Sequence, residues 1–117
     1  MASPSRLKER LARSAARLAA VQALYQMEIS GTDWRTVRIE FETHRFGADQ
    51  DGEQYREPDI GLFRAILEGV VKGQVTIDQL TDRALVERWP LGRIDATLRA
   101  VFRAAGYELT ARPDIPP

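Results

Sequence analysis

The sequence lacks cysteine, contains a single histidine (His44) and has no apolar run long enough to cross a membrane. The absence of cysteine excludes disulfides, thiolate zinc sites, iron–sulfur clusters and cysteine nucleophiles. A single histidine excludes metal sites with several histidine ligands. Charged residues interrupt every apolar stretch within about ten residues, whereas a membrane helix needs about 20. The N-terminus lacks the apolar core of a signal peptide, so we expect a cytoplasmic protein without membrane association.

Motifs of known enzymes are also missing. The chain has no glycine-rich nucleotide loop and no Gly-x-Ser-x-Gly sequence. Asp78 and Asp82 are one helical turn apart, but Arg83 beside them favours a solvated helix face over a metal site. We therefore expect a binding protein with no catalytic residue, no metal and no cofactor.

What the sequence does contain is typical of one globular domain. It has 117 residues, of which 44% are hydrophobic and 29% charged. The net charge is zero, but the charges are unevenly distributed. Residues 1–17 hold five basic residues against one acid, a net charge of +4, and residues 40–59 hold seven acids against two basic residues, a net charge of −5. A basic end indicates an anionic partner.

Apolar residues recur at helical spacing along five segments, and no segment alternates as a strand does. We expect helices over residues 5–30, from residue 34 onward, from Pro58 to Gly73, over 75–86 and over 91–109. Ser3 or Ser5 is expected to cap the first helix and Thr32 or Asp33 the second, and Pro58 and Asp59 open the third. Gly31 and Gly73 mark helix ends, and Trp89-Pro90 ends the fourth helix, on which Ile77, Leu80 and Ala84 are expected to face inward. Gly69 and Gly73 are four residues apart, which indicates close helix packing or a C-terminal cap.

This pattern of helices predicts an all-α, compact helical bundle in a single domain, 1–117. Its first part, 1–57, holds an arm, two helices and an acidic loop, and its second part, 58–117, holds three helices and a tail.

The basic arm is the most informative feature. Arg6, Arg10, Arg13 and Arg17 fall within about 60° of one another on a helix, beside an apolar stripe of leucines at positions 7, 11 and 18. The pattern predicts buried leucines and a ladder of guanidiniums in water, which attracts phosphates. Two alternatives stay open: ordinary surface arginines, or a basic helix that lies on a membrane.

Two stretches resemble the NusB family of bacterial transcription antitermination factors. Residues 13–28, Arg-Ser-Ala-Ala-Arg-Leu-Ala-Ala-Val-Gln-Ala-Leu-Tyr-Gln-Met-Glu, look like the family's arginine-rich start followed by Ala-x-Gln-Ala-Leu-Tyr. Residues 89–94, Trp-Pro-Leu-Gly-Arg-Ile, and residues 98–109, Leu-Arg-Ala-Val-Phe-Arg-Ala-Ala-Gly-Tyr-Glu-Leu, are similar to its later elements. Leu67-Glu68-Gly69-Val70 also fits. The order and spacing agree over nearly the whole chain.

The resemblance implies two small perpendicular helical bundles and a role in binding boxA-type RNA together with NusE, a small-subunit ribosomal protein, in the RNA polymerase complex on ribosomal RNA operons. By position, Arg13, Arg17 and Tyr25 match the family's RNA-binding side. With the upstream basic residues, the expected RNA-binding set is Arg6, Lys8, Arg10, Arg13, Arg17 and Tyr25. The helix over 91–109 matches the one that contacts NusE, and its expected partner-binding residues are Asp95, Arg99 and Tyr107.

The sequence departs from the family pattern in three places. Ser14 and Ala15 replace further arginines, and Leu98 replaces an acid. The chain also stops where the family continues into two more helices, so we expect a truncated chain with an incomplete second bundle. Ile94, Val101 and Phe102 would then lose part of their cover, and we expect a second copy to cover that face. Two other functions stay open: the N-terminal RNA-binding portion of an rRNA cytosine methyltransferase, or a helical module that dimerises without RNA.

Overall fold

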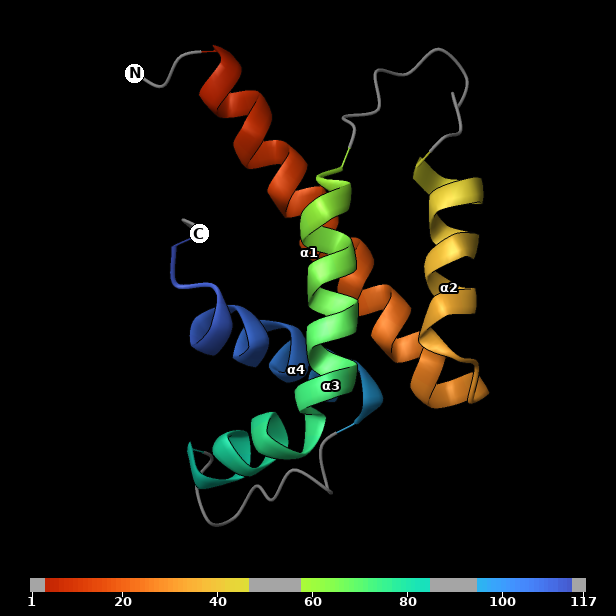
Figure 1. The fold of residues 1–117 in the computed structure, drawn as a ribbon, viewed down its shortest axis with the longest axis vertical. Coiled ribbons are helices and arrows are strands. Elements are labelled where there is room, and N and C mark those ends of the chain that lie inside the picture. Colours follow the sequence, from red (N-terminus) through yellow and green to blue (C-terminus); the bar gives the residue numbers. More distant parts are fainter. Residues whose placement is uncertain (1–3, 47–57, 85–94, 115–117) are drawn as a thin grey trace.

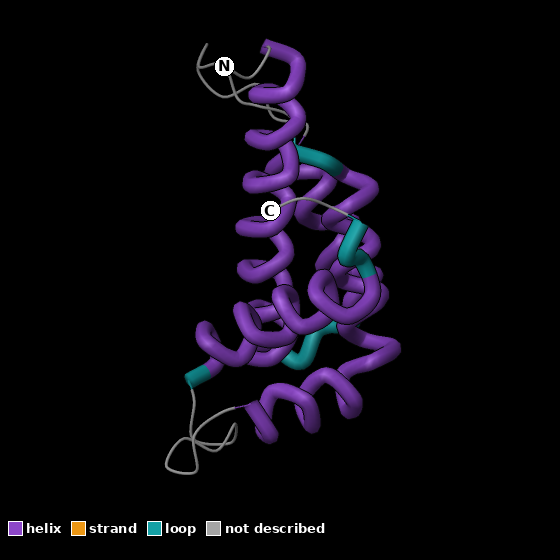
Figure 2. Tube along the Cα trace, turned by 90° about the vertical axis from the view of Figure 1, so that its left-hand side faces the viewer, coloured by secondary structure: helices purple, strands orange, loops and turns teal. Residues whose placement is uncertain are grey.

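Four α-helices and one short π-helical turn make up the described part of the chain in the computed structural model (Figure 1). The structure describes residues 4–46, 58–84 and 95–114. The elements are α1 (Pro4–Ser30), α2 (Trp34–Phe41), η1 (Glu42–Phe46), α3 (Ile60–Ala84) and α4 (Ala96–Ala111). Helices and their connections account for the whole described trace, in which there is no strand (Figure 2). The prediction of an all-α bundle is confirmed.

The first helix, α1, has 27 residues and a length of about 40 Å. Its predicted end is confirmed at Gly31, which has a φ of 72° and donates its N–H to the Met27 carbonyl over 2.8 Å. A residue without a Cβ takes this left-handed conformation at no steric cost. Ser5 was a predicted cap but lies inside the helix, and Ser3, the other predicted cap, lies outside the described residues.

The second helix begins where its cap predicts. Asp33 accepts a hydrogen bond from the Arg35 backbone N–H over 3.1 Å, which satisfies a donor at the start of α2. Val37 and Phe41 are buried, and the Phe41 ring lies 5.8 Å from the Phe63 ring, in a stacked arrangement. α2 is thereby fixed against α3.

The third and fourth predicted helices are one continuous helix, so the prediction of a break at Gly73 is wrong. Asp59 caps α3 by accepting from the Leu62 N–H over 2.9 Å, as expected. Gly73 lies inside the helix without a positive φ, although the ribbon of α3 changes direction between its green and teal parts (Figure 1). The second half stays helical because α4 holds it. Arg103 binds Asp78 through two hydrogen bonds of 3.0 and 2.9 Å.

The last helix begins later than predicted. Asp95 accepts from the Leu98 N–H over 2.9 Å and caps α4, which starts at Ala96. The predicted start at 91, the Trp89-Pro90 break, the end of the predicted helix over 75–86 and the acidic loop at 47–57 lie outside the described residues.

The buried face of α1 consists of alanines and Leu24, and the predicted face with Leu7 and Leu18 is wrong. Ala16, Ala20 and Ala23 are fully buried, whereas Leu7 and Leu18 are 46% and 61% exposed. The same holds on α4, where Ala100 and Ala104 are buried while Leu98 and Val101 are exposed. Small side chains allow helix backbones to approach closely, so the seam between these helices selects alanine over leucine. Leu80 and Ala84, predicted to face inward on α3, are also exposed.

Two glycines bring α3 and α4 into direct contact. A Cβ at Gly69 would lie 2.0 Å from Cε1 of Tyr107, so the tyrosine ring rests on the bare backbone of α3. In return, a Cβ at Gly106 of α4 would lie 2.7 Å from Cγ2 of Ile77. The predicted close packing at Gly69 is confirmed, and it fixes the position of α4.

Candidate nucleic-acid interface

The basic arm forms the first turns of α1, which extend beyond the ribbons of α3 and α4 (Figure 1). Arg6, Lys8 and Arg10 are exposed, and Arg13 is half-buried. The predicted helical arm is therefore present, and its upper three basic residues face solvent. Because a projecting helix end is reachable from several sides, these side chains can meet an extended polyanion.

Arg17 departs from the predicted ladder. Its Nε and Nη2 donate three hydrogen bonds of 2.8–3.0 Å to the carboxylate of Glu108 on α4. The helical repeat explains the contact, since Arg17 and Glu28 are three turns apart on one face of α1 and Glu28 also meets α4. There it accepts from Arg99 over 2.6 Å. The expectation that Arg17 stands in water is wrong, because the ladder face turns toward α4 at its lower end.

Arg13 lies at the border of the arm and the core. Its Nε is buried and has no hydrogen-bond acceptor within residues 4–46, 58–84 and 95–114. With Lys8, Glu9, Pro58 and Asp59 it lines a hollow of about 430 Å³ between α1 and the start of α3. The Asp59 N–H donates to the Ala12 carbonyl over 3.0 Å, which joins these two elements. The hollow therefore brings two cationic side chains, Lys8 and Arg13, close to the carboxylates of Glu9 and Asp59.

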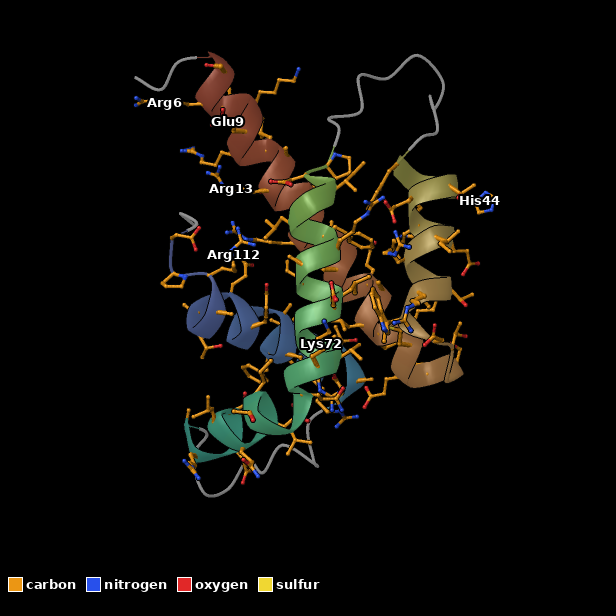
Figure 3. The ribbon with its side chains drawn as sticks, in the orientation of Figure 1. Arg6, Glu9, Arg13, His44, Lys72 and Arg112 are labelled. Atoms are coloured by element: carbon orange, nitrogen blue, oxygen red, sulfur yellow. The ribbon has the colours of Figure 1, made fainter. Side chains whose placement is uncertain are left out.

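Arg112 is a basic residue that sequence reasoning missed. In Figure 3 it lies along the same edge of the molecule as Arg6 and Arg13. Interaction with the Tyr107 side chain, and to a lesser extent with the Asp114 carboxylate, raises the pKa of Arg112 above its ordinary value. No pattern in the sequence indicates that Arg112 lies near the arm, because its position depends on α4 running antiparallel to α1.

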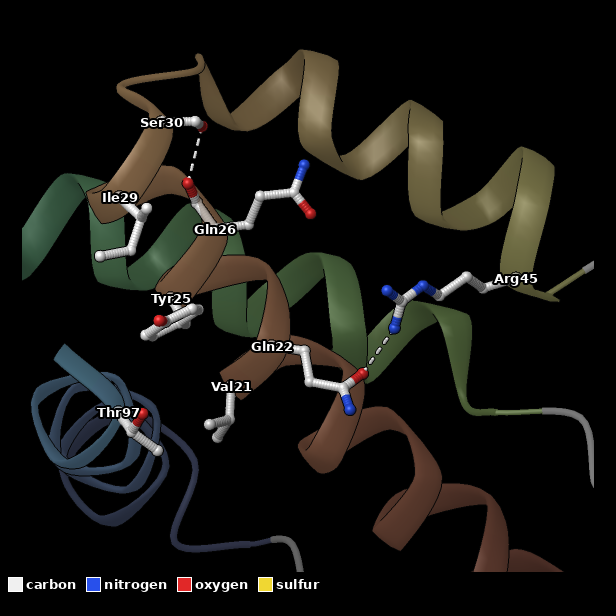
Figure 4. A pocket seen from close by; sticks show the side chains of 8 residues that line it. All are labelled: Val21, Gln22, Tyr25, Gln26, Ile29, Ser30, Arg45 and Thr97. Carbon is white, nitrogen blue, oxygen red and sulfur yellow. Dashed lines mark hydrogen bonds between the residues drawn. The ribbon is translucent and has the colours of Figure 1, made fainter.

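Tyr25 lies in a groove on the outer side of α1. Its side chain is 41% exposed. The groove has a volume of about 450 Å³ and is lined by Val21, Gln22, Tyr25, Gln26, Ile29, Ser30, Arg45 and Thr97 (Figure 4). Arg45 comes from η1 and donates to Oε1 of Gln22 over 2.8 Å. Sequence reasoning singled out Tyr25 but missed Gln22 and Arg45.

The three predicted partner-binding residues do not form one surface. Asp95 caps α4, Arg99 is bound to Glu28, and Tyr107 packs on Gly69 about 18 Å along the helix from Asp95. These contacts serve the fold. Exposed apolar side chains lie between them, among them Val101 at 40%.

The described residues contain neither a candidate metal site nor a candidate membrane-spanning helix. Asp78, considered above as half of a carboxylate pair, is bound to Arg103. Across residues 4–46, 58–84 and 95–114, no three potential metal ligands come together. No described helix combines the length and apolar content needed to cross a bilayer.

Comparison with known proteins agrees with this geometry. The model of the NusB family matches residues 14–117. Proteins named transcription antitermination protein NusB are 54% identical over 104 residues in Mesorhizobium japonicum and 52% identical over 104 residues in Agrobacterium fabrum. The one from Bradyrhizobium sp. is 52% identical over 115 residues. These alignments cover 89%, 89% and 97% of this chain and 67%, 63% and 68% of the relatives, so the chain spans about two thirds of their length. The chain belongs to the NusB family of transcription antitermination proteins.

Proposed function

We propose that this chain is a non-catalytic RNA- and protein-binding factor in transcription antitermination. It binds boxA-type RNA together with NusE, within the RNA polymerase complex on ribosomal RNA operons. The name of the relatives, transcription antitermination protein, supports the role in antitermination, and the projecting arm of α1 supports RNA binding. The single observation that carries the proposal is the set of arm cations at the end of a helix that the other described helices leave uncovered.

The arm binds RNA through its phosphates. Lys8 and Arg10 are exposed, and Arg13 is half-buried at the border of the arm. A guanidinium takes two phosphate oxygens at once, and each phosphate contact releases a counterion from the RNA. Arg112 extends this cationic edge at the end of α4 (Figure 3). Arg17 acts differently from the others, because its guanidinium holds Glu108 and so fixes α4 against the arm.

The salt dependence of RNA binding tests this proposal. We expect the affinity for a boxA-type RNA to fall steeply between low and physiological salt. In the variant R10Q/R13Q, the slope of log K against log salt should become shallower by about 1.4, because each single-strand phosphate contact contributes about 0.7. The measurement is fluorescence anisotropy at several salt concentrations. R83Q, an exposed arginine at the end of α3, is the matched control. An unchanged slope in R10Q/R13Q would contradict phosphate binding by the arm.

Protein partners are assigned to α4. We infer that NusE contacts the exposed start of this helix, around Asp95 and Leu98, with Arg99 and Tyr107 supporting its position. The methyltransferase alternative has less support, because the relatives that match along 89–97% of the chain are named as antitermination proteins. A second copy on the apolar face of α4 is supported by the exposure of Leu98 and Val101.

A further inference from the structure

We propose that the outward face of the first half of α1 is a docking site for an acidic amphipathic helix of a protein partner. The site consists of an apolar seam, formed by Leu7, Leu11 and Leu18, with a cation on each side, Lys8 and Arg10. It differs from the RNA contacts proposed above, because phosphates bind the cations and leave the leucines exposed to water.

The seam is made of the leucines that the sequence predicts in the core. Leu7 is 46% and Leu18 is 61% exposed, and Leu11 between them is half-buried. At about 100° per residue, the three side chains fall within about 40° of one another, on the side of α1 opposite its buried alanines. They extend over about 16 Å, from the projecting end of α1 toward its middle (Figure 1). A row of exposed leucines of this length indicates a binding surface.

The spacing and the width of the seam favour a partner helix over a lipid surface. Leu7, Leu11 and Leu18 are separated by four and seven residues, so they fall on d and a positions of a heptad repeat, with Ser14 on the d position between the last two. A stripe of about 40° is as narrow as a coiled-coil seam, whereas a helix that buries a whole face has an apolar stripe of about 100° or more. A helix that lies in a membrane surface needs such a broad apolar face.

The charges beside the seam specify an acidic partner. Lys8 lies about 80° to one side of the centre of the seam and Arg10 about 80° to the other, and both are exposed. These are the e and g positions of the heptad, where charges decide which helices pair. Glu9, the one acid of residues 1–17, lies about 180° from the seam. The matching helix therefore carries apolar residues at a and d and carboxylates at e and g.

A second copy of the chain matches these charges less well. Two parallel copies would place Lys8 and Arg10 of one chain beside the same cations of the other, which is repulsive. In an antiparallel pair, the arm would lie beside the second half of α1. The one acid of that half, Glu28, is already bound by Arg99. Neither arrangement supplies carboxylates for the cations beside the seam.

A designed peptide tests the site in the full chain. The probe has about three heptads, with leucine at a and d and glutamate at e and g, and repulsion between its glutamates keeps it from pairing with itself. We expect the fluorescein-labelled probe to bind the unaltered chain in an anisotropy titration. A peptide of the same charge with serine at a and d should bind at least about tenfold more weakly, because it cannot bury the leucine seam.

Two sets of variants separate this site from RNA binding. L7Q/L18Q keeps every cation, so it should weaken the probe at least about tenfold and leave the affinity for boxA-type RNA within about twofold. K8Q/R10Q should weaken both ligands, because the probe and the RNA backbone share these two cations. L80Q/L109Q replaces two exposed leucines outside the arm and is the matched control, with probe binding unchanged.

The outcomes that would overturn the docking site leave the RNA proposal intact. If the serine peptide binds as tightly as the leucine probe, or if L7Q/L18Q binds the probe as the unaltered chain does, the seam is not a docking site. If the probe does not bind and L7Q/L18Q instead reduces self-association in sedimentation equilibrium, a second copy covers the seam and the proposal is wrong. It is equally wrong if phosphatidylglycerol vesicles, and not the probe, bind the unaltered chain and fail to bind L7Q/L18Q.

Discussion

At the scale of single residues, the absence of a side chain at Gly69 allows Tyr107 to pack directly on α3. Gly69 has no Cβ, and the ring of Tyr107 occupies the space that a Cβ would need. The tyrosine predicted to bind a partner is therefore a packing residue, and interaction with its side chain raises the pKa of Arg112. Gly31, by contrast, is required for its backbone conformation, because its φ is 72°.

Gly69→Ala is expected to destabilise the fold by about 1–3 kcal/mol, because a Cβ 2.0 Å from Tyr107 forces the ring off the helix. Gly61→Ala is the matched control on the same helix, since its Cβ would meet nothing closer than 3.5 Å. This control should be neutral or more stable by up to about 1 kcal/mol. Urea unfolding of both variants measures the difference, and equal stabilities would refute the packing role of Gly69.

At the scale of helices, two ion pairs join the ends of α4 to α1. Arg17 binds Glu108 at one end, and Arg99 binds Glu28 at the other. Both pairs are partly shielded from solvent, so they are worth more than surface pairs. They hold the helix assigned to the protein partner against the helix assigned to RNA.

Glu108→Gln should have opposite effects on stability and on RNA binding. Loss of the bidentate pair is expected to cost about 1–2 kcal/mol of unfolding free energy. The guanidinium of Arg17, no longer neutralised by a carboxylate, should raise RNA affinity severalfold. Urea unfolding and anisotropy give the two values, and a double-mutant cycle with Arg17→Gln isolates the pair. RNA affinity that stays the same in Glu108→Gln would show that Arg17 is solely structural.

The sequence predicts helices better than it predicts their faces. Caps at Asp33 and Asp59 and the stop at Gly31 have local causes, so they could be placed from neighbouring residues alone. The break expected at Gly73 fails because contacts between Asp78 and Arg103 hold the second half of α3. The face of α1 that is buried depends on how closely the other helices approach. Close approach requires small side chains such as alanine, whereas a prediction from hydrophobicity assigns the buried face to leucine.

The candidate site likewise has residues that local sequence predicts and residues that only tertiary contacts place. The projecting arm could be predicted because its arginines repeat within one helix. Arg112 and Arg45 could not, because they reach their places from elements distant in the sequence. The neutralisation of Arg17 likewise depends on Glu108, which is 91 residues away.

At the scale of the whole molecule, the described surface has apolar side chains that the single chain does not cover. Leu98 and Val101 are exposed on α4, one turn apart. Burial of such residues is favourable by about 1.5–3 kcal/mol each, which is enough to favour association when several act together.

We expect this chain to self-associate as its concentration rises, with α4 at the contact. Val101→Asp should shift the equilibrium to monomer, because it places a charge in the apolar face. Val75→Asp, at a residue that is 72% exposed on α3, is the control. Sedimentation equilibrium over a range of concentrations measures this. If Val101→Asp and Val75→Asp sediment alike, the apolar face of α4 does not mediate association.

The alanine seam of α1 has a consequence for how this scaffold tolerates change. Positions 16, 20 and 23 are fully buried, so a methyl group added there would wedge the neighbouring helices apart. The outward positions of the same helix carry no such restriction. The ligand preference can therefore be changed by substituting the exposed residues of α1, while the buried alanines that set the distance to the neighbouring helices are kept.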